Sequence, residues 1–391
     1  MYNIKTYNKI SSKGLDRFPQ NAYQLSDNIE SPQGVVLRSH KLHGETIPDS
    51  LLAIARAGAG VNNIPVDDYT AKGIVVFNTP GANANAVKEL VLTGMLLSSR
   101  GIVKGMVYAQ GLTSIDDPAV MHKQLEGEKK RFAGSELAGK TLGVVGLGAI
   151  GSMVAEMALA LGMNVLGYDP ALSVEAAWRL PSQVQKMENL PSLLANADFI
   201  TLHVPAIEPT FHLINKAALS TVKKGAVLLN FARETIVHPE AVVDSLDAGH
   251  LGQYICDFPE PCLLGRDDVM AMPHIGASTA EAEENCAVMA ANQLMDYLEN
   301  GNIKNAVNFP VVSMDRAGAC RLTFSNHNVA GVLGEVLSVF TSHQVNVVDM
   351  VNKSRGDVAY NIIDLEQIPS DQAVADIRAL AHVVGLRLIK V

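Results

Sequence analysis

The sequence has few cysteines and no excess of positive charge, and each shortage excludes a class of protein. Its four cysteines form no CxxC pair and no Cys/His zinc spacing, which argues against a disulfide framework and a structural zinc site. The formal net charge of -9 argues against a nucleic-acid partner, because phosphate binding needs a basic surface. We expect inert thiols in a reducing compartment, no metal and no nucleic acid.

Long apolar runs are also missing. The first ten residues contain no apolar segment of signal-peptide length. No run reaches the ~18 residues that a membrane span needs; residues 153–167 come closest, and Glu156 interrupts them. The sequence therefore predicts a chain that is not exported, has no membrane partner and works in the cytoplasm.

The composition fits a compact α/β protein of two or three domains. The chain has 391 residues, 48% of them hydrophobic, and 31 glycines. Residues 1–85 alternate turns with short apolar runs at 34–37, 51–55 and 73–77, which predicts a small parallel sheet. A helix is expected over 86–100, and residues 111–139 are expected to be a turn-rich, charged connection.

A second region, residues 86–279, alternates strands with helices. Strand 140–145, a glycine turn, helix 152–162 and strand 164–169 form a βαβ unit, and strands follow at 199–203, 226–230 and 252–256. This order predicts a doubly wound parallel sheet. A helix over 280–300 is expected to return the chain, through residue 310, to the first domain, which is then discontinuous.

The chain after Gly301 changes character. A linker over 302–314 contains Pro310, and residues 318–391 follow the order βαββαβ, a ferredoxin-like motif. The strands are expected at 319–325, 345–352, 358–365 and 385–391, and the helices at 332–343 and 371–380. We expect this tail to be a separate unit with its own core, regulatory in role and dispensable for chemistry.

A glycine fingerprint, GLGAIG at 146–151, joins the first strand of the βαβ unit to its helix. Gly146 permits the tight turn, Gly148 lets the backbone approach a pyrophosphate, and Gly151 allows close helix–strand packing. The helix beginning near Ala149 offers free N–H groups to phosphates. Asp169 follows 18 residues after the last glycine, where it would bind ribose hydroxyls and repel a 2′-phosphate. The pattern predicts a dinucleotide site that prefers NAD to NADP, although a strand-end turn residue is the other interpretation of the aspartate.

Three later residues supply acid–base chemistry. Oxidising an alcohol requires a base for the hydroxyl proton, and His274 titrates in the useful range. Glu260 could accept a hydrogen bond from its other ring nitrogen. Arg233, at the carboxyl end of strand 226–230, could hold the carboxylate of a 2-hydroxy acid and polarise the oxygen on C2. A surface arginine and a structural His–Glu pair are the alternatives, but the combination indicates an enzyme that moves a hydride and a proton together.

These stretches resemble the NAD-dependent D-2-hydroxyacid dehydrogenase family over residues 1 to about 310, and the tail resembles the ACT-type regulatory domain of some members. The matching segments are 136–143, 146–151, 230–233, 258–261 and 273–279. The resemblance implies a flavodoxin-like substrate domain (1–85 with 280–310), a Rossmann-like NAD-binding domain (86–279) and an ACT domain (318–391). The catalytic residues of the family fall on Arg233, Glu260 and His274.

The resemblance also implies the binding residues. The expected cofactor contacts are Gly146, Gly148, Ala149, Ile150, Gly151, Asp169, His203, Val204, Pro205, Ala232, Arg233, Asp257, His274 and Gly276. The expected substrate contacts are Arg38, Ser39, Gly60, Asn83, Arg233 and His274. Arg38 is assigned to a substrate phosphate, the alternative being a solvated loop charge. Many members carry an aspartate five residues before the catalytic glutamate, whereas Asp257 lies only three before Glu260.

The tail matches the effector site of related enzymes in part. Asn328 and Asn346 match residues that bind serine in those enzymes, so they are the expected regulatory contacts. Asn326 replaces a histidine of some relatives, and Ala330 replaces the usual proline of the turn. The pattern therefore favours the ACT fold more strongly than it favours serine as the ligand.

By resemblance, the expected reaction is NAD-dependent oxidation of 3-phospho-D-glycerate to 3-phosphohydroxypyruvate, the first step of phosphorylated L-serine synthesis. The substrate would lie between the two large domains. The rivals are a dehydrogenase of unphosphorylated D-2-hydroxy acids and, from another class, a nicotinamide-sensing corepressor-like binding protein. The resemblance also implies a homodimer through the nucleotide domains, which pairing of the tails could extend to a homotetramer.

Overall fold

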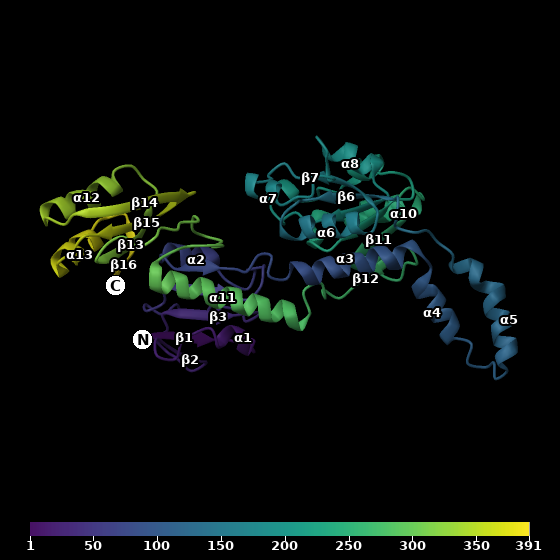
Figure 1. Ribbon diagram of the computed structural model, residues 1–391, viewed down its shortest axis with the longest axis horizontal. Helices are drawn as coiled ribbons and strands as arrows, with labels where there is room; N and C mark the ends of the chain where they lie inside the picture. Colours follow the sequence, from purple (N-terminus) through teal and green to yellow (C-terminus); the bar gives the residue numbers. More distant parts are fainter. Residues whose placement is uncertain (391) are drawn as a thin grey trace. The chain divides into compact units, whose positions relative to one another are not determined.

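The computed structural model describes residues 1–390 and divides the chain into two compact units (Figure 1). Unit 1 joins Met1–Asn83 to the segment that begins at Ala280, and unit 2 is Ala84–Thr279. The first domain is therefore discontinuous, as its pattern predicted. Val391, the expected last residue of the final strand, lies outside the described residues.

Unit 1 contains a five-stranded parallel sheet with the strand order β2-β1-β3-β4-β5. This is the flavodoxin-like order, so the predicted fold of this part is confirmed. Its strands are β1 (Tyr2–Thr6), β2 (Tyr23–Ser26), β3 (Gly34–Leu37), β4 (Ala53–Arg56) and β5 (Val75–Phe77). Its helices are α1 (Ser12–Leu15), α2 (Val66–Ala71) and α11 (Ala280–Asn300).

The predicted return helix is α11, which packs one apolar face against this sheet. Ala287, Ala290 and Leu294 on the helix share a core with Ile4 and Phe77 of the strands. The helix ends where Gly301 adopts a left-handed conformation, φ +72°, which glycine enters without a side-chain clash.

The tail forms the predicted βαββαβ unit with an antiparallel sheet of order β14-β15-β13-β16. Its elements are β13 (Cys320–His327), α12 (Val332–Ser342), β14 (Val347–Arg355), β15 (Val358–Leu365), α13 (Asp371–Arg378) and β16 (Val383–Lys390). The two helices cover one face of the sheet, where Leu322, Phe324 and Ile363 meet Val336 and Phe340. The tail thus has the core of its own that the sequence predicted.

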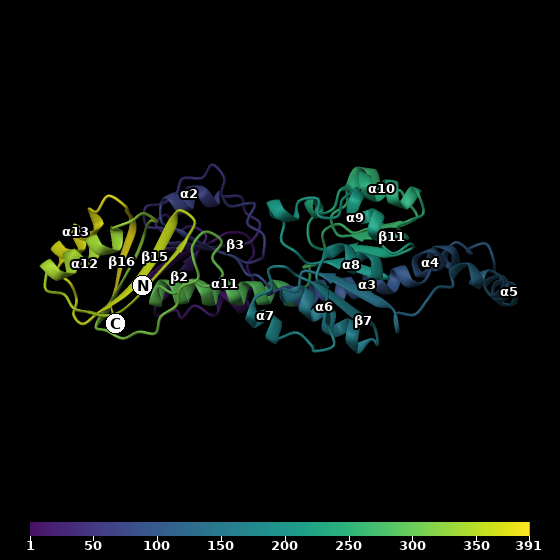
Figure 2. The ribbon, with the colours of Figure 1, turned by 90° about the horizontal axis from the view of Figure 1, so that it is seen from above.

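The opposite face of the tail sheet is also buried, which the sequence analysis did not anticipate. Tyr360 and Ile362 of β15 share the core of unit 1 with Tyr297 and Leu298 of α11. Because successive strand residues point to opposite faces, the alternate residues of β15 reach the two cores separately. Figure 2 shows α12 and α13 on one side of the sheet and α11 on the other. The tail therefore belongs to unit 1 instead of standing apart from it.

Unit 2 contains a seven-stranded parallel sheet with the order β12-β11-β10-β9-β6-β7-β8. This is the Rossmann order, and the chain reverses direction across the sheet between β6 and β9. The strands are β6 (Thr141–Val145), β7 (Asn164–Tyr168), β8 (Gln185–Lys186), β9 (Phe199–Leu202), β10 (Val227–Asn230), β11 (Gln253–Cys256) and β12 (Val269–Ala271).

Helices cover both faces of this sheet. The helices α3 (Ala84–Ser99) and α6 (Ala149–Ala160) pack on one face, and α8 (Leu190–Asn196), α9 (Lys216–Thr221) and α10 (Pro239–Asp247) pack on the other. The short helix α7 is Val174–Trp178. The 3₁₀ turns are η2 (Glu208–Thr210), η3 (Glu234–Ile236) and η4 (Pro261–Leu263).

The connection expected over 111–139 is partly helical. It follows α4 (Ile102–Gln110) and contains α5 (Pro118–Glu128) and the 3₁₀ turn η1 (Lys129–Phe132). The Asp117 carboxylate caps α5 by accepting the N–H of Ala119 at 2.8 Å, and Pro118 occupies the first helical position. This start signal overrides the turn-rich composition. No single helix among the described residues is long and apolar enough to cross a membrane; α3 and α4 together pass that test but meet at 70°.

Candidate active site

The glycine turn after β6 has the geometry that its fingerprint requires. Gly146 adopts φ +90°, and a Cβ at this position would lie 2.7 Å from the carbonyl carbon of His203. A Cβ on Gly151 would overlap the carbonyl oxygen of Gly146, so the first turn of α6 lies directly on the loop. Gly148 differs, because no atom lies within 4 Å of the position that its Cβ would take. This open space at the amino end of α6 fits a pyrophosphate.

Asp169 lies beside this turn, one residue after β7. Its carboxylate accepts the N–H of Leu147 at 2.8 Å and the N–H of Ala171 at 2.9 Å. The acid is therefore held against the glycine turn, at the position where Rossmann domains bind the ribose of the dinucleotide. The open backbone at Gly148, the helix start and this carboxylate together fit a dinucleotide without a 2′-phosphate. Ala149 and Ile150 form the first turn of α6.

Three of the expected cofactor contacts lie at the end of β9. His203, Val204 and Pro205 leave that strand on the side where the strand order reverses. The Nε2 atom of His203 lies 2.9 Å from the Thr201 hydroxyl. Burial lowers the pKa of His203 to about 3, so its imidazole is neutral at physiological pH.

Arg233 extends from the turn that follows β10. The Asn230 side chain shapes this turn by accepting the N–H of Ala232 at 3.1 Å and donating to the carbonyl of Arg233 at 2.9 Å. The guanidinium donates to the carbonyl of Ala232 at 2.6 Å, and its central carbon lies 5.4 Å from the ring centroid of Phe258. The arginine is thus held at the carboxyl edge of the sheet.

His274 contacts the same aromatic ring. The ring centroids of Phe258 and His274 are 4.4 Å apart, so Phe258 contacts both the imidazole and the guanidinium of Arg233. His274 has φ +56°, a left-handed conformation that is uncommon for residues other than glycine. Arg233 and His274 thus both lie against Phe258, and their catalytic roles stay predictions. Phe258 lies within the matching segment 258–261, but the sequence alone gives it no role.

Asp257 holds the loop that carries His274. Its side chain is buried, and its two oxygens accept the N–H of Ile275 at 2.8 Å and the N–H of Gly276 at 2.7 Å. Its carbonyl accepts the N–H of His274 at 3.0 Å. Asp257, one of the expected cofactor contacts, therefore has a structural role in this loop.

Glu260 occupies the N-cap position of the short turn η4, where its side chain makes no capping hydrogen bond, and it is half-buried. Within residues 1–390, no hydrogen bond joins it to His274, although the sequence analysis proposed one. Catalytic hydrogen bonds are often long in ligand-free enzymes and tighten in the substrate complex. Its catalytic role stays a prediction.

The expected substrate residues Arg38, Ser39, Gly60 and Asn83 belong to unit 1, whereas Arg233, Glu260 and His274 belong to unit 2. Arg38 follows β3, and its Nη1 lies 2.6 Å from Oε1 of Glu283 on α11. It is therefore not an isolated loop charge. Ser39 is exposed, and Gly60 and Asn83 are half-buried.

Arg56 is a further cation beside Arg38, and the sequence analysis missed it. It ends β4, and its Nε donates to the carbonyl of Arg38 at 3.0 Å. A charged residue at the carboxyl end of an apolar strand was the signal that identified Arg233, and the same signal marks Arg56. Two arginines on neighbouring strands can together attract an anionic group.

The two expected regulatory residues lie at opposite ends of the tail sheet. Asn328 follows β13, and its amide donates to the carbonyl of Gly356 at 3.0 Å, in the turn between β14 and β15. Asn346 precedes β14, and its amide donates to Glu366, just after β15, at 2.9 Å. One tail therefore cannot bring both amides to a single small ligand.

The fold and the site together define a class of protein. A Rossmann sheet, a glycine turn, an acid at the ribose position, and an arginine and a histidine at the carboxyl edge define a nicotinamide-dependent dehydrogenase of hydroxy acids.

Comparison with known proteins agrees with that class. Residues 109–276 match the family described as D-isomer specific 2-hydroxyacid dehydrogenase, NAD binding domain. The D-3-phosphoglycerate dehydrogenase of Escherichia coli K12 is 32% identical over 383 residues, covering 94% of this chain and 89% of the relative. The chain belongs to the D-isomer specific 2-hydroxyacid dehydrogenases, with D-3-phosphoglycerate dehydrogenases as curated relatives, and its cofactor is NAD.

Two further comparisons extend this result. The D-3-phosphoglycerate dehydrogenase of Methanocaldococcus jannaschii is 34% identical over 351 residues, and the match covers 88% of this chain but only 63% of that relative's length. The NAD⁺-bound 3-phosphoglycerate dehydrogenase structure from Entamoeba histolytica has a TM-score of 0.61 at 26% identity, covering 78% of this chain and 98% of that one.

Proposed function

We propose that this chain catalyses the NAD-dependent oxidation of 3-phospho-D-glycerate to 3-phosphohydroxypyruvate, the first step of phosphorylated L-serine synthesis, in the cytoplasm. The observation that carries the proposal is the placement of Arg233 and His274 on the ring of Phe258. This arrangement offers a carboxylate-binding fork and a base that contact one aromatic ring. The names of the curated relatives in Escherichia coli and Methanocaldococcus jannaschii support the substrate.

In this reaction Arg233 binds the substrate carboxylate and polarises the oxygen on C2. His274 takes the hydroxyl proton at one ring nitrogen, and Glu260 accepts a hydrogen bond from the other in the substrate complex. Asp257 keeps the loop around His274 in one shape. The glycine turn and Asp169 would hold NAD, which would supply the acceptor for the hydride from C2.

The substrate phosphate is assigned to Arg38. Its Nη1 is occupied by Glu283, but a guanidinium has five N–H donors, so the fork can still bind an anion. Arg56 adds a second positive charge beside it. Ser39, Gly60 and Asn83 complete the proposed contacts from unit 1.

One experiment separates this proposal from its rivals. Purified protein is mixed with NAD and a panel of D-2-hydroxy acids, and NADH is followed by absorbance. We expect the highest kcat/KM with 3-phospho-D-glycerate. A higher value with an unphosphorylated acid would identify a different dehydrogenase of the family, and NADH binding without any turnover would identify a binding protein.

The assembly is proposed to be a homodimer through unit 2, with a homotetramer as the larger possibility. The helix α4 is apolar but has no buried residue, and Val103, Met106 and Val107 are exposed. Figures 1 and 2 both show α4 and α5 extending away from the sheet of unit 2. Such a surface is typical of a subunit interface. Sedimentation of wild type and of Met106→Glu tests it; an unchanged mass for the variant would contradict the proposed interface.

The tail is proposed to bind an amino-acid effector, with L-serine as the first ligand to test. Because Asn328 and Asn346 lie at opposite ends of one sheet, the proposed site takes one asparagine from each of two paired tails. Calorimetry with L-serine and rate measurements at millimolar serine test this. No heat of binding and unchanged rates would show that L-serine is not the effector. The tail would then bind another ligand or act in assembly.

A further inference from the structure

The carboxyl end of α11 is capped by side chains from the tail. The last carbonyl groups of a helix have no partner within it, so other groups must satisfy them. Side chains of the tail, and Arg316 just before it, donate to five consecutive carbonyls here: Arg387 to Tyr297 and Leu298, Arg316 to Glu299, Arg321 to Asn300, and Tyr360 to Gly301. Three of the four donors are arginines, and cations at a helix carboxyl end also favour its dipole.

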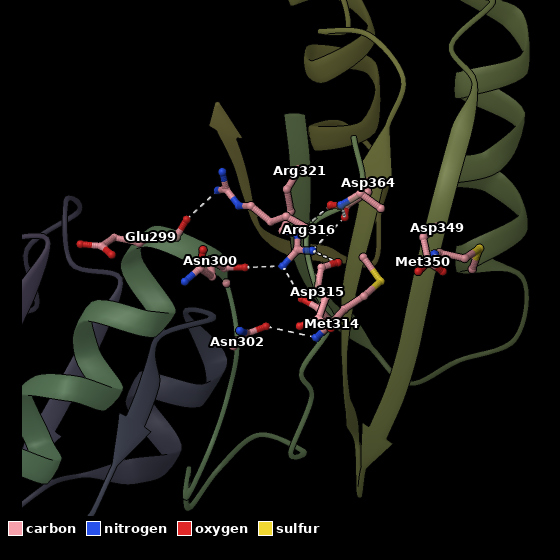
Figure 3. Close-up of polar contacts among 12 residues, drawn as sticks. Glu299, Asn300, Asn302, Met314, Asp315, Arg316, Arg321, Asp349, Met350 and Asp364 are labelled. Atoms are coloured by element: carbon pink, nitrogen blue, oxygen red, sulfur yellow. Dashed lines mark hydrogen bonds and ion pairs between the residues drawn. The ribbon is translucent and has the colours of Figure 1, made fainter. Parts of the chain in front are cut away.

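Arg321 is the centre of these contacts (Figure 3). Its guanidinium and the Asp364 carboxylate are both 1% exposed and form two parallel hydrogen bonds, of 2.7 and 2.8 Å. The same guanidinium donates to the carbonyls of Asn300, Met314 and Asp315. The arginine thus joins β13, β15, the linker and the end of α11 at one buried point.

Arg387 makes a second, independent connection. It extends from β16 to the carbonyl of Leu298 at 2.7 Å, and its guanidinium lies 4.6 Å from the ring centroid of Tyr297. No carboxylate is paired with it among the described residues. Replacing Arg387 with an apolar side chain therefore leaves no uncompensated buried charge, unlike replacement of Arg321.

The other end of α11 holds the arginine assigned to the substrate phosphate. Glu283 lies in the first turn of the helix, 2.6 Å from Arg38. Both side chains are more than a third exposed, so the pair adds little stability, and its main effect is on the direction of the guanidinium. A helix of 21 residues spans roughly 30 Å at 1.5 Å per residue.

We propose that the tail positions Arg38 through α11, and that Arg321 and Arg387 are positioning residues of the dehydrogenase. The caps fix the carboxyl end of the helix, the core of unit 1 fixes its middle, and Glu283 transmits the position of its amino end to Arg38. The tail is then part of the substrate-binding unit and not dispensable. This inference rests on the proposed function, because Arg38 matters only if the substrate carries an anionic group there.

The test compares Arg387→Met with Arg378→Met. Arg378 is an exposed arginine of α13 that caps nothing on α11, so its variant is the matched control. We expect Arg387→Met to raise KM for 3-phospho-D-glycerate about three- to tenfold, with kcat within about twofold of wild type. KM for D-glycerate, which lacks the phosphate, should not change. The control should match wild type with both substrates.

A double-mutant cycle with Glu283→Gln tests whether the effect of Arg387 reaches Arg38 through Glu283. If the effect runs through Glu283, the KM effects of Arg387→Met and Glu283→Gln should be non-additive despite the length of the helix between them. If Arg387→Met lowers the melting temperature but leaves KM unchanged, the proposal is overturned. Additive KM effects of Arg387→Met and Glu283→Gln would also overturn it. If Arg387→Met does not fold, Arg316→Met removes one exposed cap, at Glu299, and should raise the same KM less.

Hydrogen exchange separates this inference from the proposed function. If wild type does not oxidise 3-phospho-D-glycerate, the proposed function fails, but α11 can still be measured. We then expect faster amide exchange at residues 283–290 in Arg387→Met than in Arg378→Met. Equal exchange in the two variants would overturn the coupling itself.

Discussion

The carboxylate of Asp257 accepts the backbone N–H of Gly276 at 2.7 Å, and this bond closes the loop that carries His274. A Cβ on Gly276 would lie 2.9 Å from the same oxygen, so the carboxylate leaves no room for a side chain at this position. The buried acid three residues before Glu260 thus keeps His274, the proposed base, in a left-handed backbone conformation.

Asp257→Asn should therefore disturb both stability and turnover. The amide NH₂ of asparagine would face a backbone N–H, leaving a buried donor unsatisfied at a cost of about 1–3 kcal/mol. We expect kcat to fall at least about tenfold because the His274 loop loses its shape. Urea unfolding and steady-state kinetics measure these effects, with Asp267→Asn, whose side chain is 95% exposed, as control. Wild-type kinetics in Asp257→Asn would remove the loop-holding role.

His274→Asn should nearly abolish turnover while NADH binding is kept. General acid–base participation is typically worth 10²–10⁴-fold in rate, and asparagine tolerates the positive φ of this position. Steady-state rates and titration of NADH fluorescence measure the two effects. Unchanged turnover at neutral pH would exclude His274 as the base.

Asp169→Ser should narrow the preference for NAD over NADP. The carboxylate that repels a 2′-phosphate is gone, while a hydroxyl remains to accept the N–H of Leu147 or Ala171. The ratio of kcat/KM values for the two cofactors measures the change. A wild-type protein that uses both cofactors equally well would contradict the assignment of Asp169.

Arg38→Ala should raise KM for 3-phospho-D-glycerate far more than KM for D-glycerate. A charge-assisted contact is worth roughly 1.5–3 kcal/mol, or about tenfold to over a hundredfold in binding. Steady-state kinetics with the two substrates give the comparison. Equal losses on both would mean that Arg38 does not bind the phosphate.

His203 should make unit 2 less stable in mild acid. Its pKa is about 3 in the folded chain and 6.5 when exposed, so between these values the unfolded chain binds the additional proton. The contribution of neutral His203 to the free energy of unfolding is complete above pH 6.5. It is lost progressively as the pH falls below that value. His203→Gln should lose less stability than wild type between pH 7 and pH 5, by roughly 1–2 kcal/mol, in urea unfolding. His122→Gln, at an exposed site, is the control; identical pH profiles for wild type and His203→Gln would show that His203 is not the group.

Local signals predicted the nucleotide-binding unit well because its determinants are close in sequence. The turn at Gly146 and the acid at Asp169 belong to one βαβ unit, and their chemistry is visible without the rest of the chain. The first two strands of unit 1 were missed because β1 and β2 are short and carry polar residues such as Asn3 and Gln24. Two-residue β8 gave no periodic signal at all.

Contacts between distant segments could not be predicted in the same way. Arg38 and Glu283 are separated by most of the chain, and each is an ordinary surface charge when considered alone. Arg321 and Arg387 lie on strands whose neighbouring residues face an apolar core, so a solvated face was the simplest expectation for both. Only the packing of the tail sheet on α11 turns these arginines into helix caps.

The discontinuity of unit 1 sets the order in which the chain can fold during its synthesis. The first 83 residues cannot complete their core until α11 has been made. The roughly 200 residues in between form unit 2, and at about 5–20 residues per second they take roughly 10–40 s to synthesise. During that interval the faces of β1 to β5 that α11 later covers are exposed. Transiently exposed apolar strands favour aggregation, so a chaperone that binds short apolar strands would act on this nascent segment.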